Sequence, residues 1–184
     1  MTADPSAITD ILEFWFGELR EKQWWSRDPE VDEAVRKRFG KLYEALAREV
    51  PAEWRASAKG CLAAVIALDQ FPRNLFRNDA RAYATDATAL ALAREAIGQG
   101  LDAELGVTER MFLYMPFQHS EDAAVQAESV ALFERLGSED ALDFARRHKA
   151  VIDRFGRFPH RNAVLGRETT AEEQAFLAEH PAGF

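Results

Sequence analysis

The stretch ITDILEFWFGEL, residues 8–19, decides the fold class of this chain. Its apolar side chains recur at intervals of three and four residues, at Ile8, Ile11, Leu12, Trp15, Phe16 and Leu19. This spacing places them on one face of an α-helix. Asp4 and Pro5, just upstream, supply the cap and the first-turn proline of a helix start. We therefore predict an amphipathic helix packed against a core.

The same helical spacing continues along the rest of the chain. Period-two alternation bounded by turn residues, which is typical of strands, does not occur in the sequence. No linker or low-complexity tract divides residues 1–184, and this length suits a single domain. Further helices are expected at about 30–49, 53–70, 81–99, 108–115, 121–136, 139–156 and 171–179, the last with a Thr170–Glu173 capping box. The prediction is one all-α domain of about eight helices.

Composition and charge exclude several classes of partner. The formal net charge is -8, which argues against a nucleic-acid or an anionic-membrane partner because both need a basic surface. The longest apolar runs are far shorter than a membrane-spanning helix, and the N-terminal sequence lacks the basic region of a secretory signal. Cys61, the only cysteine, lies in an apolar helical run and is interpreted as an unreactive core residue. A cytoplasmic protein is expected.

Three corners that contain proline recur along the sequence. Pro72, Pro116 and Pro159 each stand beside a phenylalanine, and they are separated by 44 and 43 residues. Such a period fits one antiparallel helix pair per repeat, although three marks can also coincide by chance. If the pairs stack, the motifs LDQFPRN (68–74), PFQHSE (116–121) and RFGRFPHRN (154–162) meet on one side of the molecule.

The first motif places Asp69 in the last turn of a helix that is expected to end near Gln70–Phe71, because proline disfavours helix at the preceding residue. A negative charge is unfavourable at that helix end, and Arg73 is the obvious counter-ion. One interpretation is a structural lock, in which Asp69 pairs with Arg73 and Asn74 caps backbone groups. The other is that these polar side chains bind a ligand.

The second motif contains His119, Ser120 and Glu121. Ser120 is expected to cap a helix that begins at Glu121. His119 stands just outside that helix N-terminus, where free N–H groups favour an anion, and imidazole is readily tuned for proton transfer near neutral pH. Either a structural role or an acid–base role fits His119. A serine triad built on the adjacent Ser120 does not fit, because neighbouring side chains rarely point at one another.

The third motif concentrates polar groups within nine residues, namely Arg154, Arg157, His160, Arg161 and Asn162. One interpretation is that Arg157 pairs with Asp153 four residues earlier, and the other is that Arg157 is left for a ligand. His148 shares an apolar helical stripe with Phe144 and Phe155 and is interpreted as a core histidine.

Together the three motifs indicate a pocket for a small anion, because planar guanidinium groups match carboxylate and phosphate. The candidate catalytic residues are His119 and His160. The candidate ligand-binding residues are Asp69, Gln70, Arg73, Asn74, Glu121, Arg157, Arg161 and Asn162. No cofactor is expected: the sequence has no glycine-rich phosphate loop and no zinc-protease motif, and the arginines would repel a metal cation.

Longer stretches of the sequence resemble an uncharacterised bacterial family, one of the numbered domains of unknown function. They are ILEFWFG, LDQFPRNLFR, ATDATALALA, MFLYMPFQHSED and HKAVIDRFGRFPHRNAVLGR. The resemblance runs from about residue 8 to the C-terminus and covers all three motifs, although Phe117 and Gln118 are less typical of the second. It implies a tetratricopeptide-like αα-superhelix of antiparallel helix pairs, and it implies no established activity.

Three functional hypotheses follow. The first is a small enzyme that uses His119 and His160 as acid and base and arginines as clamps for a small anionic molecule. The second is a non-catalytic, tetratricopeptide-like module that binds a peptide carboxylate. The third is a set of structural locks in which Asp69, Glu121 and Asp153 neutralise all the arginines.

Overall fold

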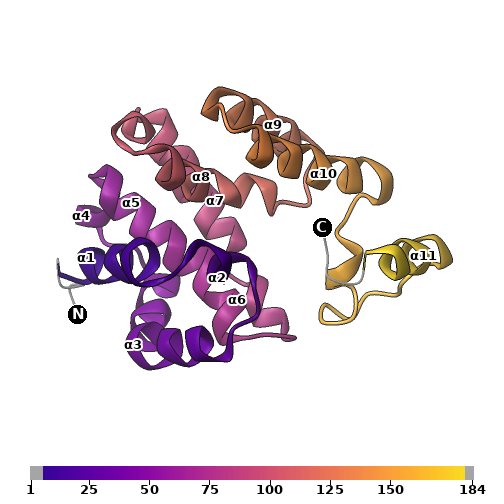
Figure 1. Cartoon of the computed structure of the whole chain (residues 1–184), viewed down its shortest axis with the longest axis horizontal. Helices are drawn as coiled ribbons and strands as arrows, with labels where there is room; N and C mark the ends of the chain where they lie inside the picture. The colour runs from indigo at the N-terminus through magenta and orange to yellow at the C-terminus, as the bar shows by residue number, and fades with distance from the viewer. Residues whose placement is uncertain (1–5, 181–184) are drawn as a thin grey trace.

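The computed structural model describes residues 6–180, and these residues form helices and connecting turns without a strand (Figure 1). The all-α prediction is confirmed. The helices of seven or more residues are α1 (Ser6–Leu12), α3 (Pro29–Arg48), α5 (Ala58–Val65), α7 (Asp86–Gly98), α8 (Val107–Gln118), α9 (Ala123–Leu136), α10 (Glu139–Phe155) and α11 (Ala171–Glu179). Among the described residues these longer helices agree in number with the eight expected.

Shorter helical elements connect the longer ones. The α-helical ones are α2 (Glu21–Trp25), α4 (Ala52–Arg55) and α6 (Phe71–Leu75). Two are π-helical, η1 (Glu13–Glu18) and η2 (Ile66–Gln70), and three are 3-10 turns, η3 (Ala80–Tyr83), η4 (Leu101–Glu104) and η5 (Pro159–Arg161). The amphipathic stretch 8–19 is therefore helical, but it changes from α to π geometry after Leu12. Its proposed cap at Asp4 and Pro5 lies outside the described residues.

Local sequence signals set several helix ends. Asp28 caps α3 by accepting hydrogen bonds from the backbone N–H groups of Glu30 at 3.0 Å and Val31 at 3.4 Å. Thr170 and Glu173 form the expected capping box at the start of α11, with distances of 3.2 and 2.8 Å. Both caps satisfy backbone donors that the first helical turn leaves without an intrahelical partner.

Two predicted boundaries around the first motif are wrong. The expected helix 53–70 is divided, because Ser57 caps a new helix by accepting from Gly60 N–H at 3.2 Å. The helix also does not end near Gln70–Phe71: α5 continues through η2 directly into α6. Phe71 keeps helical angles (φ -59°, ψ -38°), and Pro72 falls in the first turn of α6, where a missing N–H costs no hydrogen bond.

The second motif also departs from expectation. Helix α8 continues through Pro116 to Gln118, beyond the expected end at residue 115. Helix α9 begins at Ala123, and its cap is Asp122, which accepts from Ala124 N–H at 2.8 Å and Val125 N–H at 3.1 Å. The expected Ser120 cap is therefore wrong: Asp122 is one residue before the helix, whereas Ser120 is three residues away and accepts only from Asp122 N–H.

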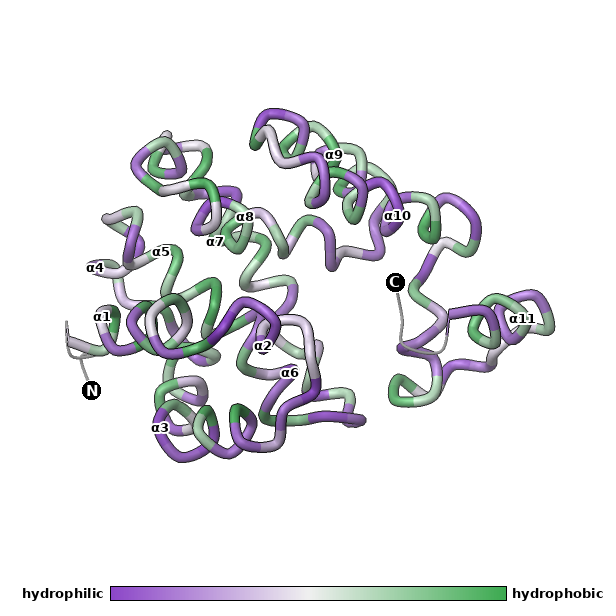
Figure 2. The backbone as a smooth tube through the Cα atoms, viewed as in Figure 1, coloured by the Kyte–Doolittle hydropathy of each residue, from purple (hydrophilic) through white to green (hydrophobic). Residues whose placement is uncertain are grey.

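Two hydrophobic cores hold the fold together. The main core joins α1 to α10 and includes the fully buried α5, whose apolar turns are green in Figure 2. Aromatic rings pack at its centre, with Phe39 stacked on Phe71 at 5.0 Å between centroids. A second, small cluster consists of Val151, Ile152, Phe158 and Phe176, with Phe155 packed against it. It attaches α11 to the end of α10, away from α1–α8 (Figure 1).

Helices α8, α9 and α10 pack against one another in chain order. The tetratricopeptide-like superhelix stays a prediction. Within residues 6–180, no helix combines the length and the apolar character needed to cross a membrane.

Candidate functional site

A cavity of about 600 Å³ lies between the main body and the C-terminal segment that follows α10. All three proline corners contribute to its wall, since Arg73, His119 and the run Phe158–Arg161 line it. The other lining residues are Arg27, Arg77, Asn78, Ala82, Tyr83, His148, Ala163, Val164, Thr169, Gln174, Leu177 and His180. Motifs that are far apart in the sequence therefore meet at one site.

The wall of this cavity is rich in cationic and imidazole groups. It carries four arginines, Arg27, Arg73, Arg77 and Arg161, and it includes every histidine of the chain. No aspartate or glutamate is among the described residues that line it. In a chain with a net charge of -8, this is a local reversal of sign that favours an anion.

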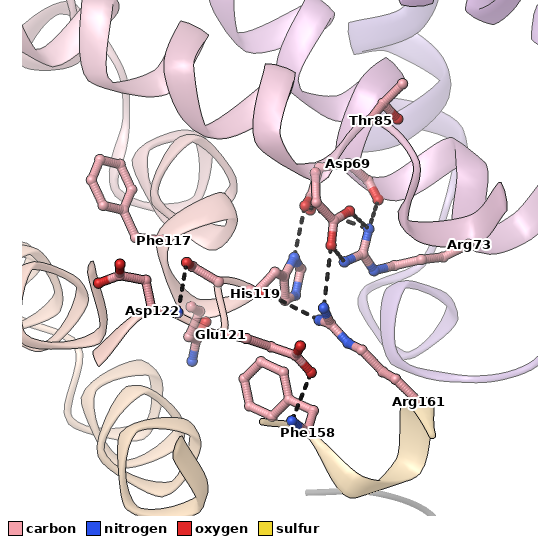
Figure 3. Close-up of polar contacts among 12 residues, drawn as sticks. Asp69, Arg73, Thr85, Phe117, His119, Glu121, Asp122, Phe158 and Arg161 are labelled. Carbon is pink, nitrogen blue, oxygen red and sulfur yellow. Dashed lines mark hydrogen bonds and ion pairs between the residues drawn. The ribbon is translucent and has the colours of Figure 1, made fainter. Parts of the chain in front are cut away.

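A buried carboxylate orients one of these histidines. Asp69 is fully buried in η2, and its Oδ1 lies 2.7 Å from Nδ1 of His119, the residue that ends α8 (Figure 3). When Nδ1–H donates this hydrogen bond, Nε2 of His119 is left as the proton-accepting nitrogen. Burial by itself would raise the pKa of Asp69, but the charges of His119 and Arg73 outweigh it and lower that pKa to about 2.

A second, half-buried carboxylate contacts the two inner arginines. Asp86 accepts two hydrogen bonds of 3.0 Å from Arg73, which also lies 3.5 Å from Asp69. Arg161 lies 3.5 Å from Asp86 and donates to the backbone carbonyl of His119 at 3.0 Å. The Arg161 guanidinium lies 4.5 Å from the centre of the Tyr83 ring. These contacts fix both guanidinium groups beside His119, as Figure 3 shows for Arg73 and Arg161.

A buried amide fixes the turn that carries His119. Gln126 is fully buried in α9, and its Nε2 donates to the carbonyl of Gln118 at 2.8 Å and to that of Ser120 at 2.7 Å. Since these two carbonyls flank His119, the backbone of the turn is held from both sides.

The remaining pocket histidines differ from expectation. His148 is half-buried and lines the cavity, with its ring 6.4 Å from that of His119, so it is not a core histidine. Burial, together with nearby His119, His160 and Arg161, lowers the pKa of His148 to about 4. The aromatic stripe was misleading because Phe144 on the same helix is 48% exposed. His160 stands on η5 at the exposed rim, where partial desolvation and Arg161 also lower its pKa.

Several candidate residues act as structural locks outside the cavity wall. Arg157 pairs with Glu173 at 2.6 and 2.9 Å and not with Asp153. Asp153 forms its ion pair with Lys149 instead. Asn162 is fully buried and donates to Glu173 at 3.2 Å. Arg157 and Asn162 therefore hold the start of α11 through Glu173, and neither lines the cavity within the described residues.

Other candidates support the wall from behind. Glu121 pairs with Arg167 at 2.7 and 3.0 Å and accepts from Phe158 N–H, which fastens the C-terminal segment to the end of α8. Asn74 donates to Asp32 at 2.8 Å and does not cap a helix. Gln70 is buried and donates to the Asp69 carboxylate. None of the three lines the cavity within the described residues.

Sequence reasoning missed three residues that shape the site. Asp86 was placed inside a predicted helix 81–99, whereas it is the first residue of α7 after the 3-10 turn. Tyr83 and Arg77 lie close to the first motif in the sequence, but neither belongs to a motif that indicates a site. Arg77 forms a bidentate pair with Asp32, a contact across 45 residues that local patterns do not reveal.

Metal ligands do not gather at this site. Across residues 6–180, no group of three or more histidine, cysteine, aspartate or glutamate side chains is placed to hold a metal ion.

Comparison with known proteins shows the family to which this chain belongs. The chain belongs to the family described as bacterial protein of unknown function (DUF924), whose model matches residues 11–181. It is similar to the solved structure of ATU0120, a protein of unknown function from Agrobacterium tumefaciens. The two chains are 41% identical, the match covers 96% of this chain and 99% of that one, and the TM-score is 0.90. No curated protein matches the chain. The predicted resemblance to a bacterial family of unknown function is thus confirmed.

Proposed function

We propose that this chain is a small acid–base enzyme that acts on an anionic small molecule in the cavity described above. His119 is the acid–base residue, and Asp69 holds its ring in the orientation that presents Nε2. Arg73 and Arg161 bind the anionic group beside it. The observation that carries the proposal is the 2.7 Å contact between a fully buried Asp69 and His119 at an arginine-rich cavity wall.

The electrostatics of Arg161 support an anionic ligand. Its side chain is 8% exposed, and its nearest carboxylate, Asp86, is 3.5 Å away and already binds Arg73 through both oxygens. Burial and the charge of Arg73 lower the pKa of Arg161, which means that its cationic form is incompletely compensated. An anion in the cavity would stabilise that charge.

The chemistry open to this arrangement is proton transfer. A neutral His119 whose Nδ1–H donates to Asp69 can accept a proton at Nε2 from a bound substrate or from water, and Asp69 then stabilises the imidazolium. His160 at the rim is the second acid–base candidate. With its pKa lowered to about 4, His148 is neutral at pH 7 and adds no charge that would repel a protonated His119.

The alternative function is a non-catalytic module that binds a peptide carboxylate through the same arginines. It does not require the Asp69–His119 pair. For either function we propose a cytoplasmic location without a nucleic-acid or membrane partner, on the basis of the acidic net charge and the single cysteine, Cys61.

A thermal-shift screen tests the proposal, with phosphate esters, carboxylates, nucleotides and C-terminal peptides as separate sets. A ligand at a hundred times its dissociation constant adds about 2.7 kcal/mol, which raises the midpoint of a domain of this size by about 5–10 °C. Arg27 is the best binding variant, because it is exposed at the cavity and has no ion-pair partner in the described part of the chain. Arg48→Ala, at an exposed arginine at the end of α3, is the matched control.

We expect Arg27→Ala to weaken binding about tenfold through loss of one charge-assisted contact, and Arg48→Ala to leave it unchanged. His119→Gln separates the two functions, since it should keep binding but abolish conversion of a bound ligand followed by NMR. A flat response in every set, or equal effects of the two arginine variants, would contradict an anion site here.

A further inference from the structure

The cavity has an apolar side that the proposed chemistry does not use. Val164, in the turn after η5, and Leu177, on α11, both line it and are half-buried. Neither packs into the main core or into the small core around Phe176, as far as the described residues show. They therefore belong to neither core, and each presents part of an aliphatic side chain to the cavity.

The cationic and apolar sides come from different parts of the chain. Arg73 and Arg77 belong to α6 and the turn that follows it, whereas Leu177 belongs to α11, and Figure 1 shows these helices well apart. Ala163 and Pro159 add further apolar surface beside Val164. The wall thus combines the guanidinium groups next to His119 with the aliphatic side chains of Val164 and Leu177. The C-terminal segment that carries these two also contributes polar lining residues, namely His160, Arg161, Thr169, Gln174 and His180.

We infer that the ligand is an amphipathic organic anion, with one carboxylate or phosphate head and a short aliphatic arm. This inference rests on the proposed function and specifies its substrate class. The head binds at Arg73 and Arg161, and the arm packs on Val164 and Leu177. A volume of about 600 Å³ exceeds what a bare phosphate or carboxylate fills, so the site has room for the arm. A hydroxyl group placed against Val164 or Leu177 would lack a hydrogen-bond partner there, which favours an apolar arm at these two residues.

The test is a chain-length series measured by NMR titration of the intact protein at constant ionic strength. One arm uses unbranched carboxylates from acetate to octanoate, and the other uses monoalkyl phosphates from methyl to hexyl, which distinguishes the two possible heads. Each methylene that becomes buried should lower the dissociation constant about threefold to fourfold, until the arm reaches the end of the cavity.

Leu177→Ala and Val164→Ala should each flatten this dependence on chain length while leaving the affinity for acetate and methyl phosphate unchanged. Leu165→Ala is the matched control, since Leu165 is the neighbouring aliphatic residue, is 37% exposed and does not line the cavity. Two variants are used so that loss of folding in one leaves the other informative.

The outcomes separate the two levels of the proposal. Binding of acetate or methyl phosphate with no gain along either series overturns the amphipathic ligand and leaves the anion site standing. Equal flattening by Leu165→Ala has the same meaning. If no member of either series binds at all, the proposed anion site itself is wrong, and this inference fails with it.

Discussion

Replacing Asp69 by asparagine tests the central contact of the site. Asparagine keeps the shape of the side chain but removes a fully buried charge that lies 2.7 Å from His119 and 3.5 Å from Arg73. The pKa of Asp69 falls from 3.8 to about 2 in the folded chain. At 1.36 kcal/mol per pKa unit, the ionised carboxylate stabilises the fold by up to about 2 kcal/mol, and the full amount applies when His119 is protonated. We expect Asp69→Asn to lose up to that amount.

The sign of the pH dependence follows from the lowered pKa. The unfolded chain takes up the proton first as the pH falls, so the contribution of Asp69 is complete above about pH 5 and is lost toward pH 2. Between pH 7 and pH 3, the difference in free energy of unfolding between the wild type and Asp69→Asn should shrink by about 1 kcal/mol. Urea unfolding at pH 7, 5, 4 and 3 measures it.

Asp143→Asn is the matched control, because Asp143 pairs with Arg147 at 2.6 Å but is 55% exposed. An exposed pair of this kind contributes less than about 1 kcal/mol. The reasoning would be refuted by a loss in Asp69→Asn no larger than in Asp143→Asn. It would equally be refuted by a difference from the wild type that stays constant down to pH 3.

Three other outcomes are expected. Glu173→Gln should lower the free energy of unfolding by about 2 kcal/mol, because Glu173 is buried and binds Arg157. Urea unfolding measures this, and a loss under about 0.5 kcal/mol would argue against a stabilising Arg157–Glu173 pair. The lowered pKa of His148 means that the unfolded chain protonates first below pH 6.5, so this group should remove about 1–2 kcal/mol of stability from pH 7 to pH 5. The pKa of His160 is lowered too, so the fall in His148→Gln should be smaller than in the wild type by that amount without vanishing, and an equal fall in the two proteins would contradict this. Burial raises the pKa of Cys61 to about 11, so an aromatic disulfide reagent should react about a hundredfold more slowly in native than in denatured protein, and fast labelling would show an open core.

The sequence predicts the fold best where the signal is local. Helix α11 occupies the predicted residues because Thr170 and Glu173 form a capping box only three residues apart. The π-helical turn at Ile66–Gln70 was not predicted, because an apolar run of the kind that fills α5 has the same hydrophobic pattern in α and π geometry. Asp69 lies in this π turn, and its side chain contacts His119, which is 50 residues later in the sequence. A contact at that separation leaves no local pattern in the sequence.

The candidate site was predicted in part, and the errors concern ion pairs over long sequence distances. The three motifs indicated the arginines and histidines correctly as a group, and Arg73, His119, His160 and Arg161 do line one cavity. Which arginine faces the cavity could not be read from the motifs. Arg157 is held by Glu173, 16 residues away, because α11 folds back over η5. A pair with Asp153 at four residues' separation requires both residues to lie on one helix, but α10 ends at Phe155, before Arg157.

The small core around Phe158 and Phe176 is separate from the main core, so we expect the two parts of the chain to differ in local stability. The C-terminal unit can open while α5 and the rest of the main core stay folded, and in that partly open state the cavity has lost one wall. An occupant that touches both walls binds only the closed state. Amide hydrogen exchange in α11 would then slow in proportion to occupancy, while exchange in α5 would stay as it was. The segment from Phe158 to the end of α11 would in that case set the residence time of the ligand in the cavity.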